Sequence, residues 1–173
     1  PMTTAVTRSP GKLPPGELEI FLVAAEESGD RLGAALMKAL RQRSTAPVRF
    51  SGVGGREMTA AGLDSLFPVG DFSIIGFAAI PRRLPHIVRR MAQTVRAVLA
   101  RRPHALVIID SPAFTLRVAR YAHWFDRSIP IIDYVSPSVW AWRSGRARAM
   151  SSYIDHVLAL LPFEPDAHQR LGG

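Results

Sequence analysis

The chain has 173 residues, of which 47% are hydrophobic and 21% charged, an ordinary balance for one globular domain with its own core. It contains no cysteine, which excludes disulfide bonds and thiolate metal ligands. The formal net charge of +8 favours an anionic partner, namely nucleic acid, anionic lipid or a phosphorylated substrate.

The first half of the chain predicts strands and helices in alternation. Residues 1–17 are aperiodic and contain Pro, Gly and Thr, so we expect a flexible leader there. The apolar run from Leu18 to Ala25 predicts a buried strand, and a helix is expected next with Ser28 as its N-cap. "VRFSGV" predicts a second strand, "GGREMTAAG" a turn and a short helix ending at Gly62, and "LDSLF" a short third strand.

The second half continues the alternation, beginning with a segment from Phe72 to Ile109 that has no acidic residue. Apolar spacing predicts a helix from Pro85 to Ala100. "HALVIID" and "IPIIDYV" lack polar alternation and predict strands covered on both faces, with a helix, "AFTLRVARYAHWF", between them. "RSGRARAMSSYI" predicts a helix, "HVLALLPF" begins with a strand, and "EPDAHQRL" begins a last helix. The pattern predicts the α/β class, an open, doubly wound and mostly parallel sheet in one domain over residues 18–173.

Sheets of this class bind ligands at the carboxyl ends of their strands, so the loops that follow the strands are the candidate sites. In "AEESGD", Gly29 permits close approach of a backbone, and the helix start offers N–H groups to an anion or a sugar hydroxyl. On this loop alone, a tight turn with a cap is the favoured interpretation. "GVGGRE" contains Gly54 but has Glu57 where a dinucleotide fingerprint needs its third glycine, so a plain turn is favoured there.

Asp110 stands at the carboxyl end of the buried strand in "IIDSPAF". A carboxylate in this position is costly unless it is hydrogen-bonded or functional. It fits a general base that accepts a proton from a hydroxyl, and it fits equally an Asp that caps the following helix. The sequence leaves both interpretations open.

The loop "VSPSVWAWRSGRAR" combines features that a hydrophobic core does not require together. Trp140 and Trp142 predict an apolar platform for a sugar ring or an acyl chain. The nearby arginines, Arg143 first among them, predict phosphate binding. The alternative is one core Trp beside a solvated basic helix start, which explains each part but not their combination.

Metal and nucleophile chemistry have no support in the sequence. The five His residues lack ligand spacing and no D-x-D element occurs, so we expect no metal and no cofactor. The basic segment, residues 82–102, fits nucleic acid, an anionic membrane or an ordinary surface helix. The apolar run just before it favours the membrane over nucleic acid, because nucleic acid has no use for exposed apolar side chains.

These motifs, together with "IIGFAAIPRRLP" and "VLALLPFEP", resemble the N-terminal part of the lipid-A-disaccharide synthase family, and "YVSPSVWAWR" is the most specific of them. The resemblance implies a Rossmann-like, acceptor-side lobe of a two-lobed GT-B glycosyltransferase, with the UDP-sugar lobe lying beyond this chain. It implies transfer of 2,3-diacylglucosamine from UDP to 2,3-diacylglucosamine 1-phosphate (lipid X), giving lipid A disaccharide 1-phosphate. It implies a peripheral enzyme at the cytoplasmic face of the inner membrane, with no nucleic-acid partner and with homo-oligomers possible.

The resemblance also assigns roles to residues of this sequence. Asp110 matches the family's proposed base, which takes the proton from the acceptor's 6-hydroxyl. The implied substrate-binding residues are Ser28, Gly29, Asp30, Gly54, Ser136, Pro137, Ser138, Trp140, Trp142 and Arg143. The implied membrane-facing residues are Phe72, Ile74, Ile75, Phe77, Arg82, Arg83, Arg89 and Arg90.

The chain departs from the family pattern at a few positions: Ala25, Ala79, Ala113 and Thr115 stand where Gly, Glu, Asp and Asn are frequent. Loss of two carboxylates favours a second interpretation, a non-catalytic anionic-lipid-binding module derived from the family. We expect this chain alone to be inactive, because most of the UDP-sugar site belongs to the other lobe in that family.

Overall fold

Parallel strands form the centre of the molecule, which is a computed structural model describing residues 15–67, 80–109, 112–134 and 152–158. For residues 80–83, 112, 113 and 156–158 it describes the backbone alone. The strands are β1 (Leu18–Ala24), β2 (Val48–Val53), β3 (Asp64–Ser65), β4 (Ala105–Ile109), β5 (Ile131–Tyr134) and β6 (His156–Leu158). They form a six-stranded sheet in the order β3-β2-β1-β4-β5-β6, and every neighbouring pair is parallel.

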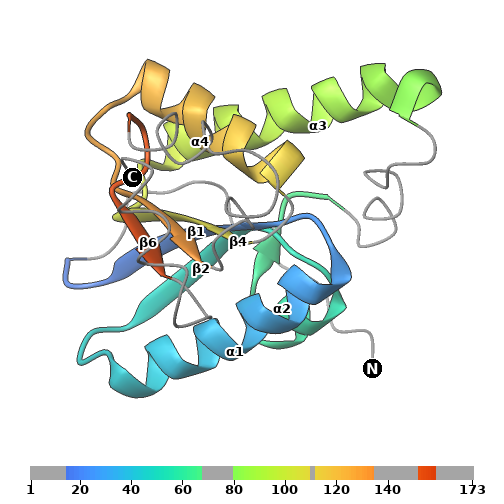
Figure 1. Cartoon of the computed structure of the whole chain (residues 1–173). Helices are drawn as coiled ribbons and strands as arrows, with labels where there is room; N and C mark the ends of the chain where they lie inside the picture. The colour runs from blue at the N-terminus through green and yellow to red at the C-terminus, as the bar shows by residue number, and fades with distance from the viewer. Residues whose placement is uncertain (1–14, 68–79, 110–111, 135–151, 159–173) are drawn as a thin grey trace.

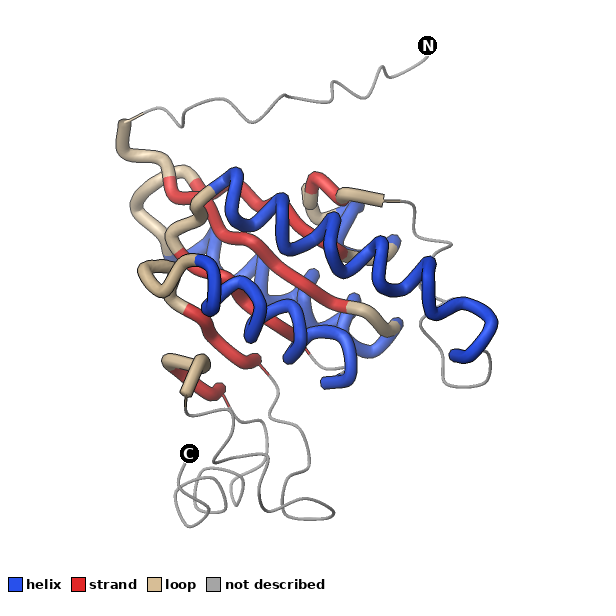
Figure 2. The backbone as a smooth tube through the Cα atoms, turned by 90° about the horizontal axis from the view of Figure 1, so that it is seen from above, coloured by secondary structure: helices blue, strands red, loops and turns tan. Residues whose placement is uncertain are grey.

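Helices cover both faces of this sheet, as Figures 1 and 2 show from two directions. They are α1 (Glu27–Arg43), α2 (Arg56–Ala60), α3 (Ile80–Arg101) and α4 (Pro112–Phe125). α1 and α2 lie on one face, and α3 and α4 lie side by side on the other. The predicted α/β class, with its doubly wound parallel sheet, is confirmed.

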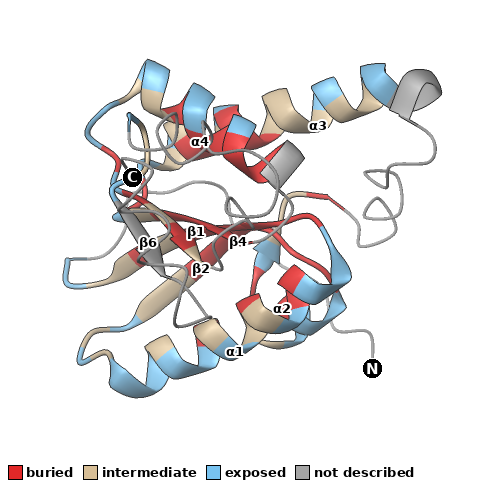
Figure 3. Cartoon of the chain, viewed as in Figure 1, coloured by how far each residue is buried: buried red, intermediate tan, exposed pale blue. Residues whose placement is uncertain are grey.

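The central strands are apolar on both faces because each face packs against helices. Along β1, Phe21 and Val23 join the core beneath α3 and α4, whereas Leu22 joins the core beneath α1 and α2. β4 alternates in the same way, with Ile108 on the first face and Ile109 on the second. Figure 3 shows this buried layer between the two sets of helices. Full burial of each such side chain contributes about 1.5–3 kcal/mol, so these runs set the position of the sheet.

Two predicted boundaries need correction. α1 begins at Glu27 with Glu26 as its N-cap residue, so Ser28 lies inside the helix and is not the N-cap. α3 begins at Ile80, ahead of the predicted start at Pro85, which therefore lies inside the helix. Residues 1–14 of the predicted leader and the predicted last helix lie outside the described residues. The helix predicted for "RSGRARAMSSYI" also falls mostly outside them, and its residues 152 and 153 form a turn.

Candidate functional site

The candidate site lies where the strand order reverses, between β1 and β4. Ala24, the last residue of β1, pairs in register with Ile109, the last residue of β4. From these two ends the chain leaves in opposite directions, toward α1 on one face and α4 on the other. In open parallel sheets this reversal opens a crevice at the carboxyl edge, and that crevice is where ligands bind.

Asp110 follows Ile109 directly and so belongs to this edge by chain connectivity. Asp110 itself lies outside the described residues, and its role as a base stays a prediction. The same holds for Ser136, Pro137, Ser138, Trp140, Trp142 and Arg143, which follow β5 in the chain and lie outside the described residues. β5 runs parallel to β4 and ends at Tyr134, opposite Ile109, at the same edge of the sheet.

The first turn of α1 contributes Ser28, Gly29 and Asp30 to this edge. Ser28 is exposed, whereas Gly29 and Asp30 are buried. The Asp30 carboxylate accepts three backbone hydrogen bonds: from the Gly55 N–H at 2.7 Å, the Glu57 N–H at 2.9 Å and the Met58 N–H at 3.0 Å. Asp30 therefore caps the N-terminus of α2 and ties it to α1, which is what the buried carboxylate does in this structure.

The glycines of the "GVGGRE" loop permit this close contact. A Cβ on Gly55 would lie 2.5 Å from Asp30 Oδ2 in α1, and a Cβ on Gly54 would lie 2.8 Å from Met58 Cβ in α2. Both distances are too short for a side chain, so the loop needs glycine here to pack against α1 and α2. Gly54 was predicted to bind substrate; what the structure describes is its packing, and the binding role stays a prediction.

Gly33 of α1 belongs to the same contact, and sequence reasoning missed it. A Cβ at Gly33 would lie 2.5 Å from Met58 Sδ, so α2 sits directly on this glycine. The signal was present in the sequence as Gly29 and Gly33, four residues apart on one helix face. It goes unnoticed because a single glycine inside a helical pattern predicts nothing definite.

The basic segment divides into exposed and packed arginines. Arg89 is exposed, whereas Arg90 is half-buried and holds its guanidinium 4.7 Å from the centre of the Phe67 ring. Arg90 also donates a hydrogen bond of 2.9 Å to Gln93. Phe72, Ile74, Ile75 and Phe77 lie outside the described residues, as do the side chains of Arg82 and Arg83. Membrane contact by this whole set stays a prediction.

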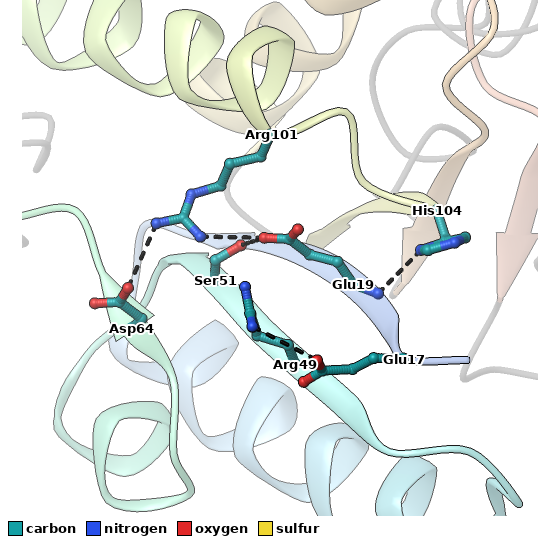
Figure 4. A network of polar contacts seen from close by, with 7 residues as sticks. All are labelled: Glu17, Glu19, Arg49, Ser51, Asp64, Arg101 and His104. Atoms are coloured by element: carbon teal, nitrogen blue, oxygen red, sulfur yellow. Dashed lines mark hydrogen bonds and ion pairs between the residues drawn. The ribbon is translucent and has the colours of Figure 1, made fainter. Parts of the chain in front are cut away.

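Arg101 has a structural role, in a polar network that Figure 4 shows near the amino end of β1. Its guanidinium lies 3.1 Å from Glu19 Oε1 and 3.4 Å from Asp64 Oδ2. Glu19 is only 3% exposed and also accepts a 3.1 Å hydrogen bond from Ser51 Oγ. The network joins α3 to β1, β2 and β3 at the edge opposite the candidate site, so one arginine of the basic segment is engaged internally.

Two other features bear on the kind of site. Among the described residues, no group of three His, Asp or Glu side chains is arranged to hold a metal ion. In the same part of the chain, no helix combines the length and the apolar character needed to cross a bilayer.

The order 3-2-1-4-5-6, with loops and helix N-termini gathered at one edge, defines the class of Rossmann-like α/β domains. Comparison with known sequences gives the family within that class. The lipid-A-disaccharide synthetase family matches residues 20–172, so the chain belongs to this family.

Curated relatives agree with this assignment. A lipid-A-disaccharide synthase of Nitrobacter winogradskyi is 65% identical over 155 residues, which are 90% of this chain and 39% of the relative. The synthase of Nitrobacter hamburgensis is 63% identical over 89% of this chain and 39% of its own length. That of Bradyrhizobium diazoefficiens is 60% identical over 90% of this chain and 40% of its own length. The chain thus spans about 39% of the length of these relatives.

Proposed function

We propose that this chain is the acceptor-side lobe of a glycosyltransferase that makes the lipid A disaccharide. The reaction joins UDP-2,3-diacylglucosamine to 2,3-diacylglucosamine 1-phosphate and releases UDP. The observation that carries the proposal is the family match over residues 20–172. The position of Asp110, directly after the β4 end of the strand reversal, supports it as the place where the chemistry occurs.

Asp110 is the residue that we assign as general base. It takes the proton of the acceptor's 6-hydroxyl while that oxygen attacks the anomeric carbon from the face opposite UDP. The configuration inverts, and no covalent intermediate on the protein is needed. Ser28 and Gly29 line the acceptor side of the crevice, and Trp140, Trp142 and Arg143 hold sugar, phosphate or acyl groups. Asp30 contributes by holding the loop around Gly54 and Gly55 in place.

Release of UDP tests this proposal. The chain alone, given both lipid substrates, is expected to release no UDP, and a fusion to the C-terminal part of the Nitrobacter winogradskyi relative is expected to turn over. In the fusion, Asp110→Asn should lower kcat by about 10²–10⁴-fold, the usual contribution of a general base. Asp126→Asn, at the residue that follows the last residue of α4, is the matched control and should leave kcat unchanged. Full activity of the Asp110→Asn fusion would show that Asp110 is not the general base.

The second candidate function is a non-catalytic module that binds anionic lipid. The all-cationic charge of α3 and α4, in which no acidic residue occurs, favours it. A fusion that folds and binds vesicles but never releases UDP would select this function over the transferase. Under either function we propose a peripheral position at the cytoplasmic face of the inner membrane, with Arg89 toward the lipid.

A further inference from the structure

α3 and α4 leave a groove of about 560 Å³ between them, on the face of the sheet opposite α1 and α2. Its floor is a row of apolar side chains on α3, because Met91, Val95 and Leu99 follow one another at intervals of four residues. Val95 is buried in the core, and the other two pack against the same core. The core therefore holds this row in place over about 12 Å of helix, or roughly two turns.

Aromatic side chains of α4 form one end of the groove. Tyr121 and Phe125 line it, and they are 41% and 70% exposed. Trp124 is 72% exposed and stacks on both, with its ring centroid 6.5 Å from that of Tyr121 and 6.1 Å from that of Phe125. An exposed apolar patch of this kind marks an interaction site. Trp, Tyr and Arg are also the residue types that contribute most of the binding energy in protein–protein interfaces.

This aromatic end lies at the amino edge of the sheet, away from the candidate site. α3 leads into β4 and α4 leads into β5, and these two strands are parallel. Phe125 is the last residue of α4, and Leu99 lies two residues before the end of α3. A molecule bound here leaves the crevice at the carboxyl edge open, so the surface suits a partner that stays bound while the crevice is in use.

The charge around the aromatic end specifies the chemistry of the partner. Arg96 and Arg117 line the groove and are exposed, and Arg120, one turn before Trp124, is exposed as well. α3 and α4 contain no Asp or Glu, and no ion pair between described residues involves any of these arginines. A surface rich in carboxylates therefore complements this face, whereas a second copy of the same face would bring cations against cations.

The form of the floor indicates a helix as the occupant. A row of side chains at intervals of four residues is the ridge against which another helix packs, and two neighbouring helices leave between them the groove that a third one fills. Helices bound in this way present apolar residues at intervals of three and four. Single-stranded nucleic acid uses aromatic rings and cations but not an aliphatic floor, so the row on α3 favours protein.

We propose that the aromatic end of the groove binds an acidic amphipathic helix of a partner protein. The apolar side of that helix lies on the α3 row and against Tyr121, Trp124 and Phe125, and its carboxylates meet Arg96 and Arg117. The interaction goes beyond the proposed function, because it requires neither Asp110 nor a nucleotide sugar. A failed docking surface leaves the UDP-release result untouched, and a failed transferase leaves the docking surface untouched.

Titration calorimetry of the full chain with a synthetic helix tests the docking. The probe is a peptide of about 18 residues, or five turns, with leucines spaced three and four apart and glutamates on the flanking positions. It should bind one to one. A peptide with lysine in place of glutamate, and a peptide of the same composition with the leucine spacing scrambled, should each bind about tenfold more weakly or worse.

Truncation of an exposed ring tests the place of binding. Trp124→Ala should weaken binding of the glutamate peptide about tenfold or more, as the loss of an aromatic anchor does, and should leave the fold intact because Trp124 is 72% exposed. Leu84→Ala, 50% exposed and nearer the start of α3, is the matched control and should leave the affinity unchanged. Should Trp124→Ala fail to fold, Phe125→Ala replaces it, since Phe125 is 70% exposed.

Reversal of charge tests the arginines. Arg96→Glu combined with Arg117→Glu should invert the preference, so that the lysine peptide binds more tightly than the glutamate peptide. The matched control, Arg43→Glu combined with Arg56→Glu, makes the same change in net charge at exposed positions of α1 and α2. It should keep the preference for glutamate, because those helices cover the other face of the sheet.

Absence of one-to-one binding by the glutamate peptide, equal binding of the lysine peptide, or full binding by a folded Trp124→Ala or Phe125→Ala variant would overturn the proposal. So would displacement of the peptide by dihexanoyl phosphatidylglycerol below its micelle concentration, which would indicate a lipid site, or by oligothymidylate, which would indicate a nucleic-acid site. A dimer that Trp124→Ala converts to a monomer would show that a second copy occupies the groove. A fusion to the C-terminal part of the Nitrobacter winogradskyi relative that no longer binds the peptide would show that this part covers the groove instead of a partner.

Discussion

At the scale of single residues, Asp30 shapes the candidate edge, because its buried carboxylate accepts hydrogen bonds from three backbone N–H groups at the start of α2. Asp30→Asn replaces one acceptor oxygen with an NH₂ group that faces a donor. We expect a loss of about 2–3 kcal/mol in the free energy of unfolding, measured by urea denaturation, since hydrogen bonds to charged groups contribute about 1.5–3 kcal/mol.

Glu27→Gln is the control for this change. Glu27 stands in the same first turn, and its ion pair with Arg31 is exposed, with side-chain exposures of 82% and 70%. Such pairs contribute about 0–1 kcal/mol, so the midpoint of urea denaturation should hardly change. If Asp30→Asn and Glu27→Gln change the free energy of unfolding equally, the hydrogen bonds to Asp30 do not stabilise the fold more than an exposed ion pair does.

Asp126 gives a prediction about pH at the same scale. The pKa of Asp126 lies below its usual value of 3.8, first because Ser128 Oγ donates to its carboxylate and then because the Ser128 N–H does so. Since the folded-state pKa is depressed, the stabilisation is complete above about pH 3.8 and is lost as the pH falls through the lower, folded value. Ser128→Ala should raise the pKa of Asp126 toward 3.8, as followed by NMR titration of the carboxyl carbon. An unchanged titration would exclude the hydroxyl as the main cause.

Single-residue roles were the least predictable part of the sequence. Ser28 has the right chemistry for an N-cap, but the short β1–α1 connection begins the helix at Glu27, so tertiary geometry overrides the local preference. Asp30 was expected only as one of the substrate-binding residues that the family resemblance implies. Its partners lie 25 to 28 positions away in the chain, and no local pattern shows such a contact.

At the scale of elements, the periodicity of apolar residues was sufficient to predict the central strands and the long helix. β1 and β4 are apolar on both faces, and α3 carries Val95 and Val98 on its buried side. The start of α3 was less clear. Apolar spacing predicted a start at Pro85, but the helix begins at Ile80 and accommodates Pro85 at the loss of one backbone hydrogen bond. The groove between α3 and α4 could not be predicted at all, because it depends on the lateral spacing of two helices.

The contact between Arg101 and Glu19 carries the prediction that belongs to this scale, since it joins α3 to the sheet. Arg101→Met leaves Glu19 buried and without its guanidinium partner. Breaking a buried ion pair from one side costs about 3–5 kcal/mol, and we expect a loss at the lower end, because the Arg101 side chain keeps 12% of its exposure. The double change Glu19→Leu and Arg101→Met should recover most of that loss.

The pair of Arg49 and Glu17 is the matched control, at 3.5 Å and with 23% and 22% side-chain exposure. Arg49→Met should cost less than about 1 kcal/mol, because water still reaches both groups. If Arg101→Met lowers the free energy of unfolding no more than Arg49→Met does, the contacts of Arg101 with Glu19 and Asp64 in Figure 4 have no special structural role.

At the scale of the whole molecule, the net charge of +8 indicates only that some anion is a partner. Its distribution is more informative. The basic segment provides exposed arginines such as Arg89, packed ones such as Arg90, and Arg101, which is engaged internally. Strand and helix alternation predicted that ligands bind at the carboxyl ends of the strands, whereas the reversal between β1 and β4 is visible only in the strand order of the structure.

Adjacent arginines therefore give a sharp test of the membrane proposal. Arg89→Gln should weaken sedimentation of the chain with phosphatidylglycerol vesicles about fivefold, the equivalent of about 1 kcal/mol per surface arginine, and should leave the free energy of unfolding unchanged. Arg90→Gln should do the opposite, because its guanidinium packs on Phe67: the protein loses stability, while vesicle binding by the folded fraction stays the same. Duplex DNA at moderate salt should bind neither variant nor the parent chain appreciably, since the exposed Leu84 and Val88 suit lipid and not a phosphate backbone. Binding of DNA as tight as binding of vesicles, or equal losses of vesicle binding in both variants, would show that charge alone governs the attraction and that this face has no preferred partner.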